Sequence, residues 1–202
     1  MKKHAIHYDT LIRVTEAISV SKDPEDVMAV TVEAVKTALN AKGAAVFLVN
    51  RKTEELELGA ASGLSRHYLD KGTLSSLKSI AASLKDGPVA VYDVGDDPRI
   101  QYPEAAKKEG IASILSVPIA TRGQVIGALR VYTADPWEAT MDDINLVQAV
   151  AQIAGMAIDM ARLTKGYKSS IEILKSMRHP KTLPSKRRTP YEGVPVSVAP
   201  PA

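Results

Sequence analysis

Residues 110–132 decide the fold of this chain, and they read Gly110-Ile-Ala-Ser-Ile-Leu-Ser-Val-Pro-Ile-Ala-Thr-Arg-Gly-Gln-Val-Ile-Gly-Ala-Leu-Arg-Val-Tyr132. Two apolar segments rich in Val and Ile flank the polar residues 121–124, a pattern typical of a β-hairpin. A hairpin is stable only when something covers one of its faces. We therefore expect the helices before and after it in the sequence to pack against it.

A long helix is predicted to follow the hairpin, starting near Thr140. Thr140 and Asp143 have the spacing of a capping box, with Asp in place of the usual Glu. Two neighbouring apolar stripes run along this helix at alternating steps of three and four residues. One stripe is enough to cover the sheet, whereas the other needs a further helix, from the first helix, from a second copy of the chain, or from both. We assign this second stripe to a dimer interface, and its members are Leu146, Val150, Ile153, Ala157 and Met160.

Turn residues and apolar periodicity divide the rest of the chain into short elements. Asp23 and Pro24 suit the N-cap and the first position of a helix. Antiparallel hairpins with helices before, between and after them predict an α+β fold, not an alternating parallel sheet. The expected elements are helices at 7–20 and 24–40, strands at 44–49 and 54–61, helices at 63–71 and 75–85, a strand at 89–92 and a helix at 104–109.

The positive charge of the chain is concentrated at its C-terminal end. Residues 164–202 hold 8 Lys or Arg against 2 Asp or Glu, a net charge of +6, whereas residues 1–163 hold 18 against 21, a net charge of −3. This distribution argues against a nucleic-acid surface on the folded part. We expect a domain at 1–163, a helical extension at 164–177, and a basic, Pro-rich disordered tail at 178–202, which either contacts a partner or is simply solvated.

Composition removes several functional classes. The chain has no cysteine, which excludes disulfides, thiolate catalysis and thiolate metal sites. The basic N-terminal residues are not followed by the apolar stretch of a signal peptide. No uninterrupted apolar run is long enough to cross a bilayer. We therefore expect a soluble, cytoplasmic protein.

A second stretch, residues 93–119, reads Asp93-Val-Gly-Asp-Asp-Pro-Arg-Ile-Gln-Tyr-Pro-Glu-Ala-Ala-Lys-Lys-Glu-Gly-Ile-Ala-Ser-Ile-Leu-Ser-Val-Pro-Ile119. It resembles bacterial GAF domains, the small-molecule-sensing relatives of the PAS fold. In many of them a strand ends in Asp-Val, an acidic-Pro-Arg loop and a Tyr-Pro-Glu-Ala helix start follow, and Glu-Gly-Ile leads to a strand ending in Ser-Val-Pro. Residues 125–132, Val-Ile-Gly-Ala-Leu-Arg-Val-Tyr, are similar to the family's closing strand. The resemblance covers about residues 8–162 and indicates a stand-alone GAF domain.

The resemblance implies a central antiparallel sheet with the N- and C-terminal helices packed on one face. It also implies a ligand pocket on the other face, closed by residues 63–110, and a dimeric bundle of the first and last helices. Bilin-binding relatives attach their pigment through cysteine, and sulfoxide-reductase relatives use cysteines for catalysis, so the absence of cysteine removes both. The Asn-Lys-Phe-Asp-Glu pattern of cyclic-nucleotide relatives is not recognisable here. The ligand or cofactor is therefore unknown from sequence.

The densest polar cluster lies in the loop at 93–103. In the functional interpretation Arg99 binds an anionic ligand and Tyr102 covers it. In the alternative, the Asp residues cap turns and pair with Arg99. His67 lies on the expected pocket wall, but it is structural or exposed in the alternative, since no His cluster has metal-ligand spacing. The candidate pocket residues are His67, Tyr68, Tyr92, Asp93, Arg99, Tyr102 and Ser116.

Two functions fit the sequence. The first is a non-enzymatic sensory module that binds a small molecule and signals through a helical homodimer interface to a signalling partner. The second is a dimeric interaction scaffold without a ligand, which recruits a protein through its basic tail. No nucleophile motif, metal set or acid–base pair supports an enzyme.

Overall fold

Six antiparallel strands form a single sheet in the order β3-β2-β1-β6-β5-β4. The structure is a computed structural model that describes residues 2–21, 23–72, 74–75 and 87–178. The central strand β6 lies between β1 and β5 and is paired along most of its length with both. The strands are β1 (Gly43–Asn50), β2 (Glu55–Ser62), β3 (Leu74–Ser75), β4 (Val89–Val91), β5 (Ser113–Thr121) and β6 (Gln124–Thr133).

The hairpin of residues 110–132 joins β5 to β6 by a two-residue loop. Thr121 pairs with Gln124 across the turn. Arg122 and Gly123 both have positive φ, at 50° and 74°. Positive φ at both loop positions is the geometry whose twist matches that of the two strands. The predicted hairpin and its turn are therefore confirmed.

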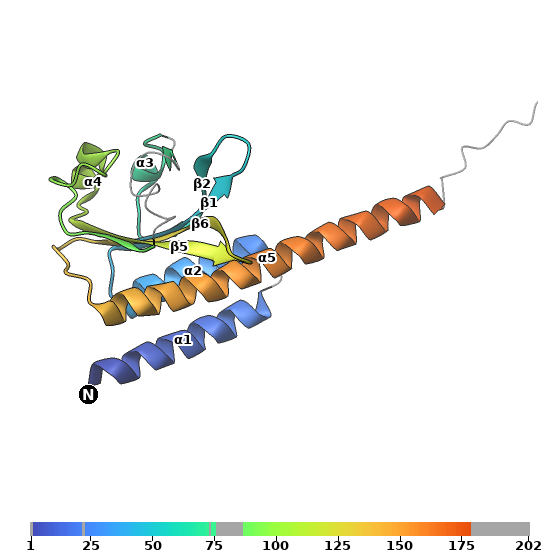
Figure 1. Cartoon of the computed structure of the whole chain (residues 1–202), viewed down its shortest axis with the longest axis horizontal. Helices are drawn as coiled ribbons and strands as arrows, with labels where there is room; N and C mark the ends of the chain where they lie inside the picture. The colour runs from blue at the N-terminus through green and yellow to red at the C-terminus, as the bar shows by residue number, and fades with distance from the viewer. Residues whose placement is uncertain (1, 22, 73, 76–86, 179–202) are drawn as a thin grey trace, which may run out of the picture. The chain divides into compact units, whose positions relative to one another are not determined.

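Helices cover the sheet on both sides, which confirms the α+β class with N- and C-terminal helices on one face (Figure 1). That face carries α1 (Lys2–Val20), α2 (Pro24–Ala38) and the part of α5 (Met141–Arg178) that precedes residue 166. The opposite face carries the short helices α3 (Arg66–Leu69) and α4 (Pro103–Glu109) (Figure 1). The chain divides into two compact units, Met1–Lys165 and Gly166–Ala202. The predicted three-part division, with its boundaries at 163 and 177, stays a prediction.

The two predicted helix starts have different outcomes. The Asp143 amide donates to Thr140 Oγ1 at 3.2 Å, and Thr140 N donates to Asp143 Oδ2 at 3.0 Å, so the capping box before α5 is confirmed. Asp23 has the extended backbone of an N-cap residue, and Pro24 follows it as expected. However, the Asp23 side chain makes no capping hydrogen bond and is exposed to solvent. The prediction that it caps α2 is wrong at the level of the side chain.

Helix predictions between the two hairpins are only partly met. The helix expected at 63–71 shortens to the single turn α3, because Ser65 Oγ caps it by accepting from Tyr68 N at 3.1 Å. The helix expected at 75–85 lies outside the described residues except for Ser75, which belongs to β3. The helices expected at 24–40 and 104–109 correspond to α2 and α4.

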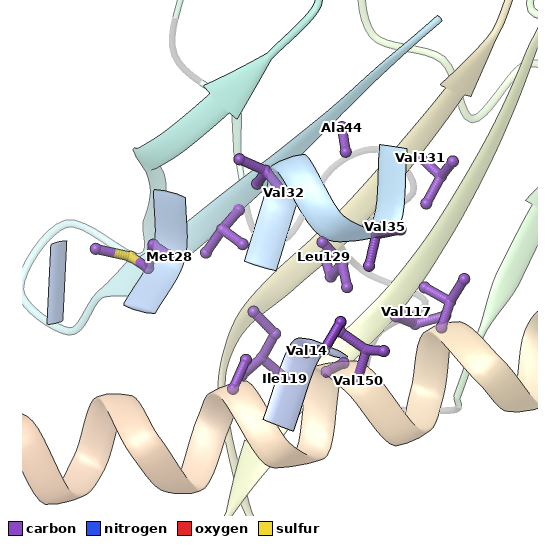
Figure 2. Packing of buried hydrophobic residues seen from close by; sticks show 14 of the residues in the cluster. Val14, Met28, Val32, Val35, Ala44, Val117, Ile119, Leu129, Val131 and Val150 are labelled. Atoms are coloured by element: carbon purple, nitrogen blue, oxygen red, sulfur yellow. The ribbon is translucent and has the colours of Figure 1, made fainter. Parts of the chain in front are cut away.

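The main core lies between the sheet and the helices of the first unit (Figure 2). Alternate residues of β5 and β6 point into it, since successive side chains of a strand face opposite sides. α5 approaches β5 closely at Gly155, where a Cβ would lie 2.9 Å from the Ala120 carbonyl oxygen. The strand residues in this core include Val117, Ile119, Leu129 and Val131, all fully buried.

This core also takes part of the stripe assigned to a dimer interface. Leu146 and Val150 are 5% and 0% exposed, and they share the core cluster with Val14 of α1. Both residues are therefore buried within the first unit, which argues against a role in a dimer interface, and that assignment stays a prediction. Ile153 and Ala157 are half-buried against the core.

Helix α5 is long and apolar enough, over Met141–Met177, to cross a membrane by length and composition. Its mean hydropathy reaches 1.3 in an 18-residue window. The sequence-based expectation counted only uninterrupted apolar runs and so missed this segment. Core helices of soluble proteins pass the same test, and 39% of the window is buried inside the protein. The test is therefore weak evidence for a membrane span.

Candidate functional site

The face of the sheet opposite the helical core carries a second buried cluster. Tyr68 of α3 packs edge-on against Tyr132 of β6, with ring centroids 6.0 Å apart and ring planes at 84°. Tyr68 is placed there because the Ser65 cap fixes the single turn of α3. The loop that precedes α4 adds Ile100 and Tyr102 to this cluster. The sheet therefore has two cores, one on each face.

A small cavity lies within this second cluster, with a volume of about 20 Å³. A space of that size holds about one water molecule. Its walls come from the end of α3, from the loop before α4 and from the sheet. The lining residues are Tyr68, Lys71, Leu74, Arg99, Ile100, Gln101, Tyr102, Ile114 and Arg130.

Arg130 is the most unusual side chain at this cavity. It is only 5% exposed, because β6 is a central strand and its pocket face is covered. Its Nε and Nη2 atoms find no hydrogen-bond partner among the described residues. Its Cζ lies 5.1 Å from the centroid of the Phe47 ring. Buried guanidinium groups are normally paired, so this one is costly in the absence of a partner.

Ser116 lies beside Arg130 on the same face of the sheet. The two residues are paired in the β5–β6 register, and side chains of directly opposed residues are close neighbours. Ser116 is fully buried, and its Oγ also has no partner in the described part of the chain. Three orphaned polar atoms, from two adjacent residues, therefore lie on the pocket face of the sheet.

Lys71 brings a second positive charge to the cavity. Its Nζ lies 3.4 Å from the centroid of the Tyr68 ring and donates to the Tyr68 carbonyl oxygen at 2.9 Å. Burial and then the charge of Arg130 lower the pKa of Lys71 to about 8, against a smaller opposite effect of Glu109. Glu109 is itself engaged by the backbone N–H of Ser65 at 2.8 Å and by its hydroxyl.

The charge of Arg130 also acts on Tyr132. Burial raises the pKa of the Tyr132 hydroxyl, and the positive charge of Arg130 and a hydrogen bond from it partly offset that rise. Tyr132 therefore stays a neutral phenol at physiological pH and does not neutralise the guanidinium. The orphaned atoms of Arg130 remain Nε and Nη2.

The predicted pocket residues fall into two groups. Tyr68, Arg99 and Tyr102 line the cavity, and Ser116 faces the same side of the sheet. The others lie outside the lining. His67 is exposed, Tyr92 is 58% exposed, and Asp93 Oδ1 accepts from Gly95 N at 2.7 Å in the loop. Their assignment to a ligand site stays a prediction without a shared cavity to support it.

Arg99 has the arrangement that the alternative interpretation expected. Its Nε donates to Asp97 Oδ1 at 2.9 Å, and its Nη2 donates to Oδ2 at 2.5 Å. The same contacts lower the pKa of the Asp97 carboxyl, chiefly through the hydrogen bond from Arg99. The charge of Arg99 is therefore balanced within its own loop, although the side chain borders the cavity.

Sequence reasoning missed Arg130 and Lys71. A signal for Arg130 was present, since a charged residue between Leu129 and Val131 interrupts a strand predicted at the sheet centre, where both faces are buried. No comparable signal marks Lys71, because it follows a single helical turn whose position only the fold reveals.

Two hollows are larger than this cavity. One, of about 310 Å³, lies near the β5–β6 turn, and its Arg122 is paired with Asp159 at 3.1 Å. The other, of about 360 Å³, lies along β2 and shares Lys71 and Leu74 with the small cavity. Within the described residues, no three His, Asp or Glu side chains converge to hold a metal ion. Among the described residues that line these two hollows, none has a buried side-chain polar atom without a partner, as Arg130 has.

Comparisons with known proteins agree with this architecture. The GAF domain family matches residues 23–158. A search of curated proteins finds no match. Among solved structures, the GAF domain of a phosphoenolpyruvate-protein phosphotransferase from Coxiella burnetii superposes with a TM-score of 0.71 at 18% identity, over 79% of this chain and 96% of that one.

Two further solved structures have a similar fold. Free methionine-R-sulfoxide reductase from Neisseria meningitidis, solved with its substrate, gives a TM-score of 0.69 at 20% identity, covering 81% of this chain and 94% of that one. A domain of a putative two-component sensor histidine kinase protein from Sinorhizobium meliloti gives 0.62 at 25% identity, covering 73% and 99%. The family match spans more than half of the chain, and the sheet order and helix placement accompany it. The chain belongs to the GAF domain family.

Proposed function

We propose that this GAF domain is a non-enzymatic sensory module that binds a small molecule on the pocket face of its sheet. The observation that carries the proposal is the buried guanidinium of Arg130, whose Nε and Nη2 are unpaired in the described structure. Native proteins rarely leave such groups unsatisfied, and each exception calls for an explanation. A ligand that satisfies Arg130 supplies one. The module is expected to act in the cytoplasm, on a signalling partner.

The two faces of β6 provide a route from pocket to helices. Arg130 faces the cavity, while its neighbours Leu129 and Val131 are fully buried in the helical core. A ligand that prefers one position of β6 therefore also favours one packing of α5 against the sheet. The shift in population is limited by the difference in ligand affinity between the two packings.

We propose that the change in the packing of α5 acts on a second copy of the chain. In the first unit, α5 exposes Met156 and Met160, at 60% and 69%, outside the part of the stripe that α1 covers. In the second unit, exposed apolar residues continue at helical spacing with Tyr167, Ile171 and Leu174. Apolar residues at alternating steps of three and four are typical of helices that pair in coiled coils. We therefore move the proposed dimer interface from Leu146 and Val150 to the exposed residues Met156 and Met160 of the first unit.

A thermal-shift screen tests ligand binding. The full chain is heated with neutral, anionic and cationic metabolites, and a ligand of the native state raises the Tm with its concentration. If no compound raises the Tm, and an experimental structure shows the pocket filled only by its own side chains, the sensory function fails.

A charge placed on α5 tests the dimer. Met160→Glu is expected to lower the dimer fraction in sedimentation, because a charge is buried against the partner helix. Gln152→Glu adds the same charge at an exposed position of the same helix and serves as the control. Equal dimer fractions for both variants at all concentrations would exclude this surface.

A ligand-free scaffold is the second candidate, and the small volume of the cavity, about 20 Å³, favours it. In this case the domain is a dimeric platform, and residues 178–202 recruit a protein partner. Removing residues 178–202 then abolishes binding to that partner while the dimer stays intact. If the truncated chain keeps the partner, the tail is not the recruiting segment and the scaffold proposal fails.

A further inference from the structure

We infer that the pocket takes a small oxyanion, a carboxylate or a phosphate ester, which is held by Arg130 with help from Lys71 and Ser116. This inference rests on the proposed sensory function and specifies the chemical class of its ligand. The three groups come from β6, from β5 and from the residue that follows the C-cap of α3, so only the folded chain brings them together.

The orphaned atoms define what the ligand must supply. Arg130 offers two N–H donors, Nε and Nη2, that have no acceptor in the described structure. These two donors point in parallel from one edge of the guanidinium plane, which matches the two oxygens of a carboxylate or phosphate group. Ser116 Oγ adds a hydroxyl that donates or accepts beside them. A neutral ligand leaves the buried positive charge uncompensated.

The charge balance of the lining favours an anion. Among the described residues, the lining includes Lys71, Arg99 and Arg130 but no Asp or Glu. Arg99 is neutralised by Asp97 at 2.5 Å, which leaves two cations without a carboxylate in direct contact in the part of the chain that the structure describes. Glu109 acts on Lys71 only from a distance and is bound to Ser65. A ligand with one or two negative charges neutralises the positive charges of Lys71 and Arg130.

The ligand needs more space than the small cavity alone offers. The small cavity and the hollow of about 360 Å³ share Lys71 and Leu74 in their linings, so the two spaces adjoin at these residues. The hollow by itself has the size usual for small-molecule pockets. The ligand is therefore a small organic anion whose charged group lies at Arg130 and whose remainder extends toward the hollow.

Lys71 makes the binding depend on pH. Its pKa near 8 results from burial and from Arg130 on β6, opposed by Glu109 at the end of α4. Among the described lining residues, the other titratable or charged groups are Tyr68, Tyr102, Arg99 and Arg130. A bound anion stabilises the charged form of Lys71 and raises its pKa. Binding therefore takes up protons, and the affinity falls as the pH rises through 8.

The test compares a charged probe with its neutral isostere. The full chain is titrated with succinate, with succinamide and with inorganic phosphate at constant ionic strength, and the Tm is measured. At about 100 times the dissociation constant, we expect a rise of roughly 5–10 °C with succinate or phosphate. Succinamide is expected to have no effect. A response to phosphate alone identifies phosphate esters, and a response to succinate alone identifies carboxylates.

Two variants show whether the anion raises the Tm by binding at Arg130. Arg130→Met removes the buried charge and is expected to raise the Tm of the free protein while abolishing the response to the anion. Arg51→Met removes an exposed arginine that contacts Gln124 and is expected to retain the full response. If Arg130→Met does not fold, Lys71→Met replaces it and must lower the affinity at pH 7 but not at pH 9.5.

The outcomes separate this inference from the proposed function. A neutral metabolite that raises the Tm of wild type and Arg130→Met equally overturns the anion inference and leaves the sensory function standing. Equal effects of succinate on Arg130→Met and Arg51→Met also overturn it, since the anion then binds elsewhere. A complete absence of response to every compound, charged or neutral, contradicts both.

Discussion

Val150 distinguishes burial within one chain from burial between two chains. It is fully buried in the core cluster that includes Val14 of α1 (Figure 2). Val150→Ala removes two methyl groups and so loses about 1.6 kcal/mol of transfer free energy, at roughly 0.8 kcal/mol per group. If about 40 Å³ of cavity remains, the cavity adds about 1 kcal/mol. The free energy of unfolding should therefore fall by about 2.5 kcal/mol.

Urea unfolding followed by circular dichroism measures this loss. With a urea dependence of about 2 kcal/mol per M for a domain of this size, the midpoint should fall by about 1.2 M. Met160→Ala is the matched control, since Met160 is on the same helix but 69% exposed. Surface changes usually alter stability by less than about 0.5 kcal/mol. Met160→Ala should instead reduce the dimer fraction in sedimentation.

Protein concentration separates the two effects further. A loss of stability caused inside the monomer core is the same at low and at tenfold higher protein concentration. A loss of stability caused at a dimer interface depends on protein concentration. We expect the loss for Val150→Ala to be independent of concentration. An unchanged midpoint for Val150→Ala together with a smaller dimer fraction would refute the reasoning, because Val150 would then pack against a second copy.

Three further changes test the fold and the site. Thr140→Ala removes the capping box with Asp143 and should cost about 1 kcal/mol in urea unfolding; a loss near zero would show that the box does not hold in solution. Gly127→Ala should leave little soluble folded protein, because its Cβ would lie 2.1 Å from the Phe47 carbonyl oxygen, and a native circular dichroism spectrum would contradict this close approach. For Lys71, the pKa near 8 lies below its unfolded value of 10.5, so wild-type stability should rise between pH 8 and 10.5 as the folded state releases its proton first. Lys71→Met should therefore be more stable than wild type at pH 7. The difference between their urea midpoints should become smaller at pH 9.5. A difference that is the same at both pH values would exclude a lowered pKa of Lys71.

The hairpin and the start of α5 were predictable because their signals are local. Alternating apolar residues with a short polar turn determine β5 and β6, and the two-residue loop at Arg122 and Gly123 confirms the turn. The capping box at Thr140 depends only on residues three apart. Asp23 shows the limit of such signals, since its position is that of an N-cap while its side chain remains in solvent.

The partner of the second α5 stripe was not predictable because burial there depends on distant residues. Periodicity shows that Val150 needs an apolar neighbour, but it does not say whether Val14 or another chain supplies it. The same limit applies to the site. Tyr68 and Tyr102 were predicted on the pocket wall, whereas the contribution of Lys71 depends on how a single helical turn docks on the sheet.

The unpaired guanidinium connects the stability of the domain to its proposed signal. Arg130 lowers the stability of the free protein because, among the described residues, its buried charge has no ion-pair partner, and such a charge is costly. In the proposed sensory function, a bound oxyanion removes that cost and favours the position of β6 that aligns Arg130 with the ligand. Leu129 and Val131 lie on the same strand and are fully buried in the helical core, and close-packed cores transmit small shifts. A shift of β6 would therefore also change the packing of α5, and the residue that weakens the free domain would give its ligand a preference between two helix positions.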